Sequence, residues 1–143
     1  NLRATYARTA NALARAGQTE KAIEVLNTAT SKMPVSKLGY DYFSLGLIEG
    51  YYVAGDAESA KAMAEGFKTD IVQRLEYFAQ FKGKQARQVR SEVEANMQYL
   101  QMLARMNLQY TVGMALTQEA YQADPLVQLY EKYAQQFGIQ QQQ

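Results

Sequence analysis

The sequence predicts an all-α protein made of antiparallel helical hairpins, and three observations carry this prediction. Apolar residues recur every three or four positions along most of the 143 residues, as they do on one face of a helix. Only two prolines and nine glycines interrupt the chain, which is few for a protein with many β-turns. No stretch is convincing as a strand, and the short links between neighbouring helices favour hairpins.

Local signals place the ends of about seven helices along the chain. Gly17 ends the first helix, and Thr19 is a candidate N-cap for the second, which Pro34 stops. Gly55 ends the third helix, and Asp56 is a candidate N-cap for the fourth. The expected helices cover, in order, residues 2–16, 20–32, 40–54, 57–81, 86–107, 109–122 and 126–137.

The fourth and fifth helices are expected to be long. The fourth has apolar residues at intervals of four and three, the spacing that keeps one seam against a partner helix: Ala60, Ala64, Phe67, Ile71, Leu75 and Phe78. At 1.5 Å per residue, roughly 25 and 22 residues span about 37 and 33 Å, so we expect a projecting hairpin. Residues 35–39 are expected to form a loop, and Asp124 followed by Pro125 predicts a new helix start.

A pattern of small, large and turn residues recurs along the chain. In its first copy the residues are Tyr6, Ala10, Leu13, Gly17, Ala22, Leu26, Ala29 and Pro34. Gly55 and Ala60 repeat the spacing of Gly17 and Ala22, 38 residues further on. The pattern resembles the tetratricopeptide repeat, a unit of about 34 residues whose two helices pack antiparallel. Small residues let such helices approach closely, glycine makes the turn between them, and proline ends the second helix.

The pattern departs from the tetratricopeptide repeat further along the chain. Val72 stands where the second copy would have its proline, and Thr117 where the third would have a large apolar residue. We therefore expect a short, irregular, right-handed superhelix that forms one domain at 1–138. Its expected parts are repeat one at 2–34, repeat two at 40–81, a long helix with a degenerate third repeat at 86–125, a capping helix at 126–137 and, beyond the domain, a disordered tail at 139–143.

A second resemblance is found in "GYDYFSLGLIEGYYVAGDAESAKAMAEGF", residues 39–67. Together with the preceding repeat, this stretch is similar to the soluble C-terminal region of a family of multi-pass bacterial membrane proteins. These proteins are glycosyltransferase-like and protein O-mannosyltransferase-like, of uncharacterised function, and occur mainly in Bacteroidetes. The resemblance implies a periplasmic, extramembrane domain of an inner-membrane parent, which would itself be the glycosyltransferase. The chain also begins at Asn1 without an initiator methionine, so we expect a piece of a longer protein.

Composition excludes several functions within this chain. There is no histidine and no cysteine, which removes His-based catalytic triads, thiolate nucleophiles and the usual zinc sites. Fifteen basic and fourteen acidic residues give a net charge of +1, which does not favour a nucleic-acid partner. No apolar run is long enough for a membrane span, so a membrane would be reached only through the parent chain. We therefore expect no enzyme activity, cofactor or metal in this chain.

In tetratricopeptide arrays the first helix of each repeat lines a concave groove. By position, the groove residues here are Asn11, Arg15, Tyr42, Glu49, Tyr52, Gln98, Met102 and Arg105. Such tyrosines, amides and charges would suit an extended peptide or a partner helix. The alternative interpretation is that some of the tyrosines are core residues. A clamp for a C-terminal carboxylate is disfavoured, because Ala7 stands where that clamp needs a lysine.

The sequence leaves two functional hypotheses open. The first is a non-catalytic module for protein–protein interaction or assembly, with a protein or peptide partner or a second copy of the chain. The second is an accessory domain that helps a membrane glycosyltransferase dock its acceptor. The basic cluster of Lys82, Lys84, Arg87 and Arg90 would contact phosphate or anionic lipid, or else is a solvated hairpin tip.

Overall fold

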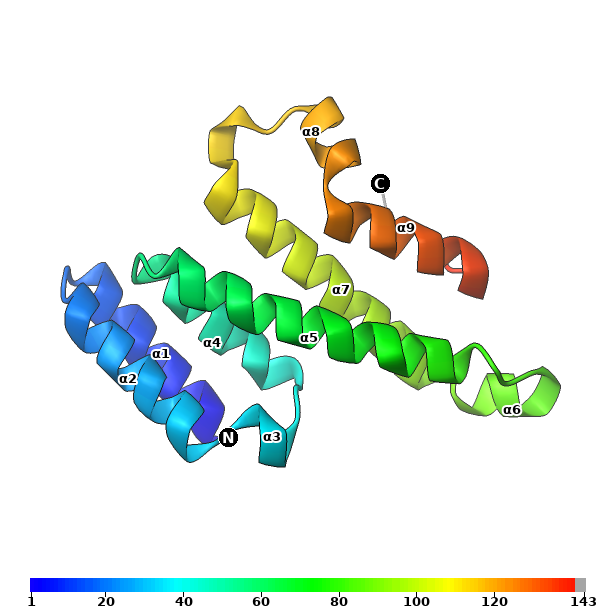
Figure 1. The fold of residues 1–143 in the computed structure, drawn as a ribbon, viewed down its shortest axis with the longest axis horizontal. Helices are drawn as coiled ribbons and strands as arrows, with labels where there is room; N and C mark the ends of the chain where they lie inside the picture. Colours follow the sequence, from blue (N-terminus) through cyan, green and yellow to red (C-terminus); the bar gives the residue numbers. More distant parts are fainter. Residues whose placement is uncertain (141–143) are drawn as a thin grey trace. The chain divides into compact units, whose positions relative to one another are not determined.

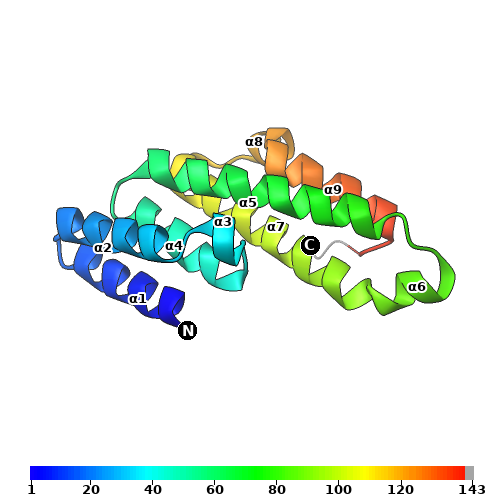
Figure 2. The ribbon, with the colours of Figure 1, turned by 60° about the horizontal axis from the view of Figure 1, so that its bottom comes forward.

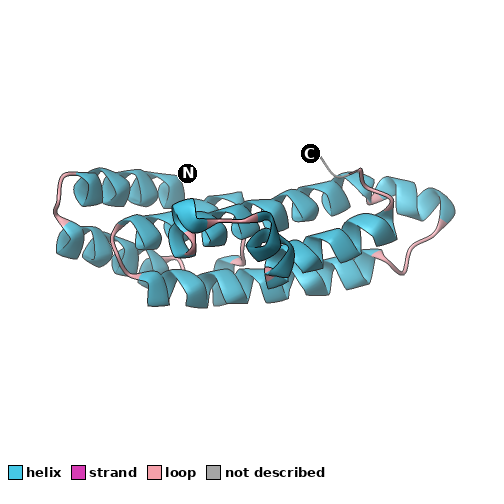
Figure 3. Cartoon of the chain, turned by 90° about the horizontal axis from the view of Figure 1, so that it is seen from above, coloured by secondary structure: helices cyan, strands magenta, loops and turns pink. Residues whose placement is uncertain are grey.

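The computed structural model describes residues 1–140, and all regular structure in this range is helical (Figures 1 and 3). The prediction of an all-α protein is confirmed, and no strand occurs among the described residues. The elements are α1 (Leu2–Arg15), α2 (Thr19–Lys32), α3 (Val35–Leu38), α4 (Tyr42–Val53), α5 (Ala57–Phe78), α6 (Gly83–Gln88), α7 (Arg90–Thr111), the 3₁₀ helix η1 (Gly113–Ala115), α8 (Gln118–Ala123) and α9 (Pro125–Phe137).

Short helices account for most of the differences from the expected elements. Residues 35–39, expected to be a loop, contain α3, and α6 forms in the link that follows α5, so the described residues hold nine α-helices. The helix expected at 109–122 is wrong, because α7 continues to Thr111 and η1 separates it from α8. Gly113 adopts φ +60°, a left-handed conformation that interrupts an α-helix. α5 and α7 are long, as expected, with 22 residues each.

Two predicted helix starts are confirmed and one is wrong. The Asp56 carboxylate accepts a hydrogen bond from the backbone N–H of Ser59 at 3.1 Å, as an N-cap does. Asp124 caps α9, and Pro125 occupies the first turn of that helix. Thr19 is not an N-cap, because α2 already begins at this residue, and the N-cap position carries no side-chain cap bond.

The chain divides into two compact units, Asn1–Phe67 (unit 1) and Lys68–Gln143 (unit 2), and the boundary lies within α5. Residues 139–140, at the start of the expected tail, lie outside any helix. Residues 141–143, the rest of that tail, lie outside the described residues. Within the described part, no helix combines the length and the apolar character that crossing a membrane requires.

Unit 1 contains the hairpin of α1 and α2, and its turn is made by Gly17. Gly17 has φ +83°, which a residue with a side chain rarely adopts. Its N–H donates to the Ala14 carbonyl at 3.0 Å, and the next N–H, of Gln18, donates to the Leu13 carbonyl at 2.9 Å. These two bonds form a Schellman motif, which satisfies the last carbonyls of α1 and reverses the chain.

The turn between α4 and α5 has the same geometry. Gly55 has φ +87°, and its N–H donates to the Tyr52 carbonyl at 3.1 Å. The N–H of Asp56 donates to the Tyr51 carbonyl at 2.9 Å, completing a second Schellman motif. Two hairpin turns of one design therefore follow each other 38 residues apart, at the spacing found in the sequence.

Small residues allow α1, α2 and α4 to pack closely, and α1 contacts both α2 and α4 extensively (Figure 1). A Cβ atom added at Gly50 would lie 2.9 Å from Leu26 Cδ2, and one added at Gly46 would lie 3.2 Å from Ala7 Cβ. The predicted repeat positions that are fully buried are Ala10, Ala22, Leu26, Ala29 and Ala60. The other two apolar positions, Tyr6 and Leu13, are half-buried.

A buried arginine joins the ends of several elements in unit 1. Arg3 is 3% exposed, and its Nη2 donates to the Gly39 carbonyl at 3.0 Å and to the Met33 carbonyl at 3.4 Å. Its Nη1 lies 3.4 Å from Ser44 Oγ and forms an ion pair of 3.2 Å with Asp41. One guanidinium therefore ties the N-terminus of α1 to the segments before and after α3.

Unit 2 has an apolar contact between α7 and α9. Ala104 and Leu108 of α7 form a buried cluster with Val127 of α9. Beside it, Asn107 donates to the free carboxylate oxygen of the cap residue Asp124 at 3.1 Å. This contact fixes the start of α9 against the C-terminal part of α7.

Two further polar contacts hold the other end of α9 within unit 2. The hydroxyl of Tyr133, which is 1% exposed, donates to Glu76 of α5 at 2.5 Å. Arg90, the first residue of α7, donates to the Phe137 carbonyl at 2.6 Å. One side chain of α5 and one of α7 thus each form a hydrogen bond with a polar group of α9.

Candidate functional site

A cleft of about 390 Å³ opens in unit 1 among α2, α3, α4 and α5. Each of these elements contributes to its wall, so the cleft is closed by several segments rather than lying on one helix. We call it the α2–α3–α5 cleft, and it is lined by Thr30, Met33, Pro34, Val35, Ser36, Tyr40, Tyr51, Ser59, Ala62 and Met63.

Pro34 and Gly39 shape one wall of this cleft. Pro34 cannot continue α2, and with φ −68° and ψ 142° it starts α3 as its N-cap residue. Gly39 ends α3 after a single turn with φ +71°. The chain therefore makes a short detour between α2 and α4, which places Val35 and Ser36 in the cleft wall.

An aromatic stack places Tyr40 in the lining. Its ring stacks on that of Phe67, with centroids 5.1 Å apart and planes at 12°. A Cβ atom added at Gly66 would lie 2.1 Å from the Tyr40 hydroxyl oxygen, so any other residue at 66 would force the phenol to shift. Gly66 is therefore explained by this close approach.

Tyr51 provides a hydroxyl that is already engaged within unit 1. The Tyr51 hydroxyl donates to Asn27 Oδ1 at 2.8 Å and lies 3.5 Å from Thr30 Oγ1. Burial raises the pKa of Tyr51, the hydrogen bond with Thr30 opposes this change, and the negative charge of Asp56 adds to it. The phenol is therefore neutral at physiological pH and links α4 to α2 as a hydrogen-bond donor.

The lining determines what the α2–α3–α5 cleft can do chemically. Its side chains are apolar or carry hydroxyls, and none carries a carboxylate, an amine, an imidazole or a thiol. Hydroxyls without a neighbouring base are poor nucleophiles, so these residues can bind a ligand but have no general base among them. Met33 and Met63 have flexible side chains that adapt to different apolar shapes.

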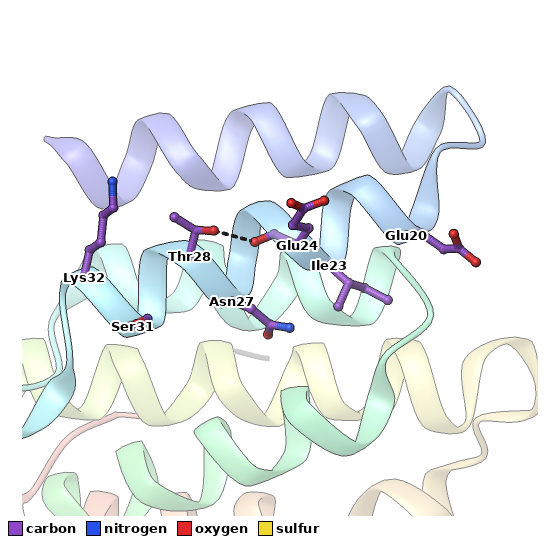
Figure 4. Close-up of a pocket in the computed structure, with 7 residues that line it drawn as sticks. All are labelled: Glu20, Ile23, Glu24, Asn27, Thr28, Ser31 and Lys32. Carbon is purple, nitrogen blue, oxygen red and sulfur yellow. Dashed lines mark hydrogen bonds between the residues drawn. The ribbon is translucent and has the colours of Figure 1, made fainter.

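A second hollow in unit 1 lies on the surface of α2 and is not closed by another element. Figure 4 shows its seven lining residues, all projecting from α2: Glu20, Ile23, Glu24, Asn27, Thr28, Ser31 and Lys32. The hydroxyl of Thr28 bonds the Glu24 carbonyl of the same helix at 2.9 Å. This hollow is therefore an open helix face with solvated charges.

None of the predicted groove residues of unit 1 lines the α2–α3–α5 cleft. Asn11 is half-buried and donates to the Ala7 carbonyl of its own helix at 2.9 Å. Arg15 and Tyr42 are exposed, and Glu49 is half-exposed. Tyr52 is 7% exposed, and burial raises its pKa, so it offers little surface to a partner.

The remaining predicted groove residues lie on α7 in unit 2. Gln98 and Arg105 are exposed and Met102 is half-buried. Their spacing of four and three residues places them on one side of α7. They provide a polar surface with one adaptable apolar side chain.

No direct signal in the sequence indicates the α2–α3–α5 cleft, because the sequence predicts a loop at residues 35–39. The sequence predicts Pro34 only as a helix stop, although the same residue is also the N-cap of α3. The contacts of Tyr40 with Gly66 and Phe67 join residues 26 and 27 positions apart, which a local pattern does not reveal. A glycine within a long predicted helix, as at Gly66, was the one available hint of a close approach.

Comparison with known proteins does not assign this chain to a family. No family model matches the sequence, and neither the curated proteins nor the solved structures give a match. Among the described residues, no three or more acidic side chains are grouped so that they could hold a metal ion. The function is therefore argued from the α2–α3–α5 cleft and the arrangement of the helices.

Proposed function

We propose that this chain is a non-catalytic protein-interaction module whose hairpins stack in the manner of tetratricopeptide repeats. Two hairpins in unit 1 share the same glycine turn, and α1 packs against both α2 and α4. The alanines at the repeat positions are fully buried, as close stacking of hairpins requires. These features support the repeat architecture, and repeat arrays of this kind present extended binding surfaces.

The observation that carries a binding role is the chemistry of the α2–α3–α5 cleft. Its lining combines two methionines with hydroxyl groups and carries no ionised side chain. A charged ligand group placed there would lose water without gaining a counter-ion, which is costly. The ligand is therefore an uncharged peptide segment of a partner, with an aliphatic or aromatic side chain as its anchor.

The cellular context is part of the same proposal. We place the module in the periplasm, as the extramembrane part of a larger bacterial membrane protein. The support is the resemblance of residues 39–67 to such a family. A partner bound there would be recruited to the parent protein at the membrane.

A random-peptide selection on the purified chain tests the proposed ligand chemistry. We expect enriched peptides to be uncharged and to share an apolar or aromatic anchor. Met63→Arg should weaken their binding by at least about tenfold, because the new charge would lie in the apolar lining without a partner. The matched control is Gln73→Arg, which adds the same charge at an exposed residue of the same helix and should leave binding unchanged.

Several outcomes of this selection would contradict the proposal. Enrichment of charged peptides would contradict the uncharged ligand inferred from the lining of the cleft. No enrichment at all would contradict the proposed binding role. A peptide that binds Met63→Arg as well as the unmodified chain would lie outside the α2–α3–α5 cleft. If binding were instead lost in a Gln98→Ala, Arg105→Ala double variant, the surface would be the groove side of α7.

A further inference from the structure

Positive charge is concentrated in one short part of unit 2. Residues 77–91, which we call the basic connector, hold four of the fifteen basic residues and none of the fourteen acidic ones. Eleven basic and fourteen acidic residues remain elsewhere, so the rest of the chain has a net charge of −3. Figure 2 shows the basic connector running from the end of α5 through α6 into α7. The charge of the chain is therefore strongly uneven although its total is close to zero.

Three of the four cations in the basic connector are free to bind a ligand. Lys82, Lys84 and Arg87 are exposed, and no carboxylate in the described part of the chain forms an ion pair with them. Arg90 differs, because it pairs with Glu94 at 3.0 Å and donates to the Phe137 carbonyl at 2.6 Å. Arg90 thus anchors the start of α7, while the other three cations face solvent.

The short helix α6 lies beside a hollow of unit 2 that has both apolar and polar lining residues. Ala86 and Val89 line this hollow of about 240 Å³ together with Phe81 and residues of α5, α7 and α9. Lys84 and Arg87 each precede one of these two residues by two positions, which is about 200° around a helix. Ala86 and Val89 therefore contact the hollow, whereas Lys84 and Arg87 lie outside its lining and are exposed.

An exposed aromatic ring accompanies the cations. Tyr77 is 57% exposed, and its ring packs edge-on against Phe81, with centroids 5.2 Å apart. Tyrosine is favoured at the boundary between membrane and water, where its ring contacts lipid and its hydroxyl stays hydrated. Tyr77 lies at one end of the basic connector, so lysines, arginine and an interfacial aromatic residue occur in one segment.

We infer that the basic connector docks the chain on the surface of a bilayer that contains anionic lipid. The free cations of Lys82, Lys84 and Arg87 complement lipid phosphate groups, and Tyr77 enters the headgroup region. Each cation near such a surface contributes about 1 kcal/mol, so three cations give a weak, reversible attachment. Nucleic acid fits less well, because proteins that bind it make many phosphate contacts, whereas the rest of this chain is negative. The inference is independent of the α2–α3–α5 cleft and its peptide.

Co-sedimentation of the full chain with vesicles tests this inference. We expect partition onto phosphatidylcholine vesicles with about one third phosphatidylglycerol, and much weaker partition onto pure phosphatidylcholine. Replacing Lys82, Lys84 and Arg87 together by glutamine should lower the partition coefficient by on the order of 100-fold, about fivefold per charge. Tyr77→Ala should lower it several-fold, and salt near 1 M should abolish it, because the Debye length then falls to about 3 Å.

The matched control removes three exposed cations from other positions: Arg8, Lys21 and Lys61, each replaced by glutamine. This control has the same net charge as the connector variant and should keep the partition of the unmodified chain. An equal loss in both triple variants would show that only net charge matters and would overturn the inference. So would a lack of partition by the unmodified chain, or binding to a single-stranded RNA through the same cations without binding to vesicles.

Discussion

The two units of this chain are held together by different means. In unit 1, small residues bring helices into close contact, and two identical glycine turns set the hairpins. In unit 2, an apolar cluster joins α9 to α7, and individual polar contacts from residues distant in the sequence hold both ends of α9 in place. Unit 1 therefore depends mainly on a recurring turn and on close contacts of small residues, whereas unit 2 depends on particular contacts made by α9.

This difference predicts how each unit responds to substitution. Where small residues bring helices into close contact, the stability is sensitive to any increase in side-chain volume, because no space remains for added atoms. A contact between two polar groups is sensitive to the loss of one partner and tolerates a change of volume at exposed neighbours. Stability measurements on variants of each kind can therefore test whether the units differ in this way.

The largest effect should come from removing the central side chain of unit 1. Leu26 is fully buried in α2 and lies against Gly50 of α4. Leu26→Ala should lower the free energy of unfolding by about 2–5 kcal/mol, because the lost contacts leave a cavity. Chemical denaturation monitored by circular dichroism measures this change. The control Ile23→Ala, at a half-buried position of the same helix, should cost clearly less; equal costs would contradict a core centred on Leu26.

Enlarging a small residue of unit 1 should have the next largest effect. Ala29 is 0% exposed, so Ala29→Leu should cost about 1–3 kcal/mol through overpacking. The control is Ala12→Leu, the same substitution at an exposed position of α1. Thermal unfolding of both variants gives the comparison. If Ala29→Leu melts at the temperature of the unmodified chain, the close packing of unit 1 is wrong.

The same difference explains how much of the fold the sequence predicts. Gly17, Pro34, Gly55 and Asp124 mark helix ends through their own backbone preferences, so their roles are visible without a structure. The single-turn helix α3 is too short to show a helical period, and it was missed. The break at Gly113 was missed as well, because one glycine in an apolar stretch does not by itself end a helix.

The candidate site is harder to predict from sequence than the fold, for a physical reason. The α2–α3–α5 cleft depends on Tyr40 lying over Gly66, a contact across 26 residues that no local preference encodes. Arg3 looks like a surface residue of an alanine-rich helix, yet it is buried by four partners from other segments. Tyr52, predicted from its repeat position to face a partner, is buried. Repeat positions indicate which side of a helix a residue occupies, and tertiary packing decides whether that side is exposed.

In unit 2, removing one hydroxyl should have a moderate effect that depends on pH. Burial, together with the hydrogen bond to Glu76 and the charge of Glu76, raises the pKa of Tyr133 to about 12. Tyr133→Phe should lower the free energy of unfolding at pH 7 by about 0.5–1.5 kcal/mol, the usual net value of a hydrogen bond. Tyr121→Phe, at an exposed residue, is the control and should change stability little.

The pH dependence of this difference follows from the raised pKa. An unfolded tyrosine ionises near pH 10, while folded Tyr133 stays neutral up to about pH 12. The unfolded state therefore binds fewer protons than the folded state in this window, and stability falls as pH rises. The stability advantage of the unmodified chain over Tyr133→Phe should be complete below pH 10 and should shrink between pH 10 and about 12. An advantage that stays constant over this window would contradict the buried contact with Glu76.

The smallest effect is expected at Thr19, in unit 1. The sequence predicts this residue as an N-cap, whereas the structure makes it the first residue of α2, and a substitution distinguishes the two. If Thr19 were an N-cap, Thr19→Ala would lower the free energy of unfolding by about 1 kcal/mol. In the structure Thr19 lies inside α2, so Thr19→Ala should change stability by less than about 0.5 kcal/mol. Asp56→Ala is the matched comparison, because Asp56 caps the second helix of the following hairpin and should show the full loss. Equal losses at both positions would mean that the two hairpins begin their second helices alike, and that Thr19 caps α2 after all.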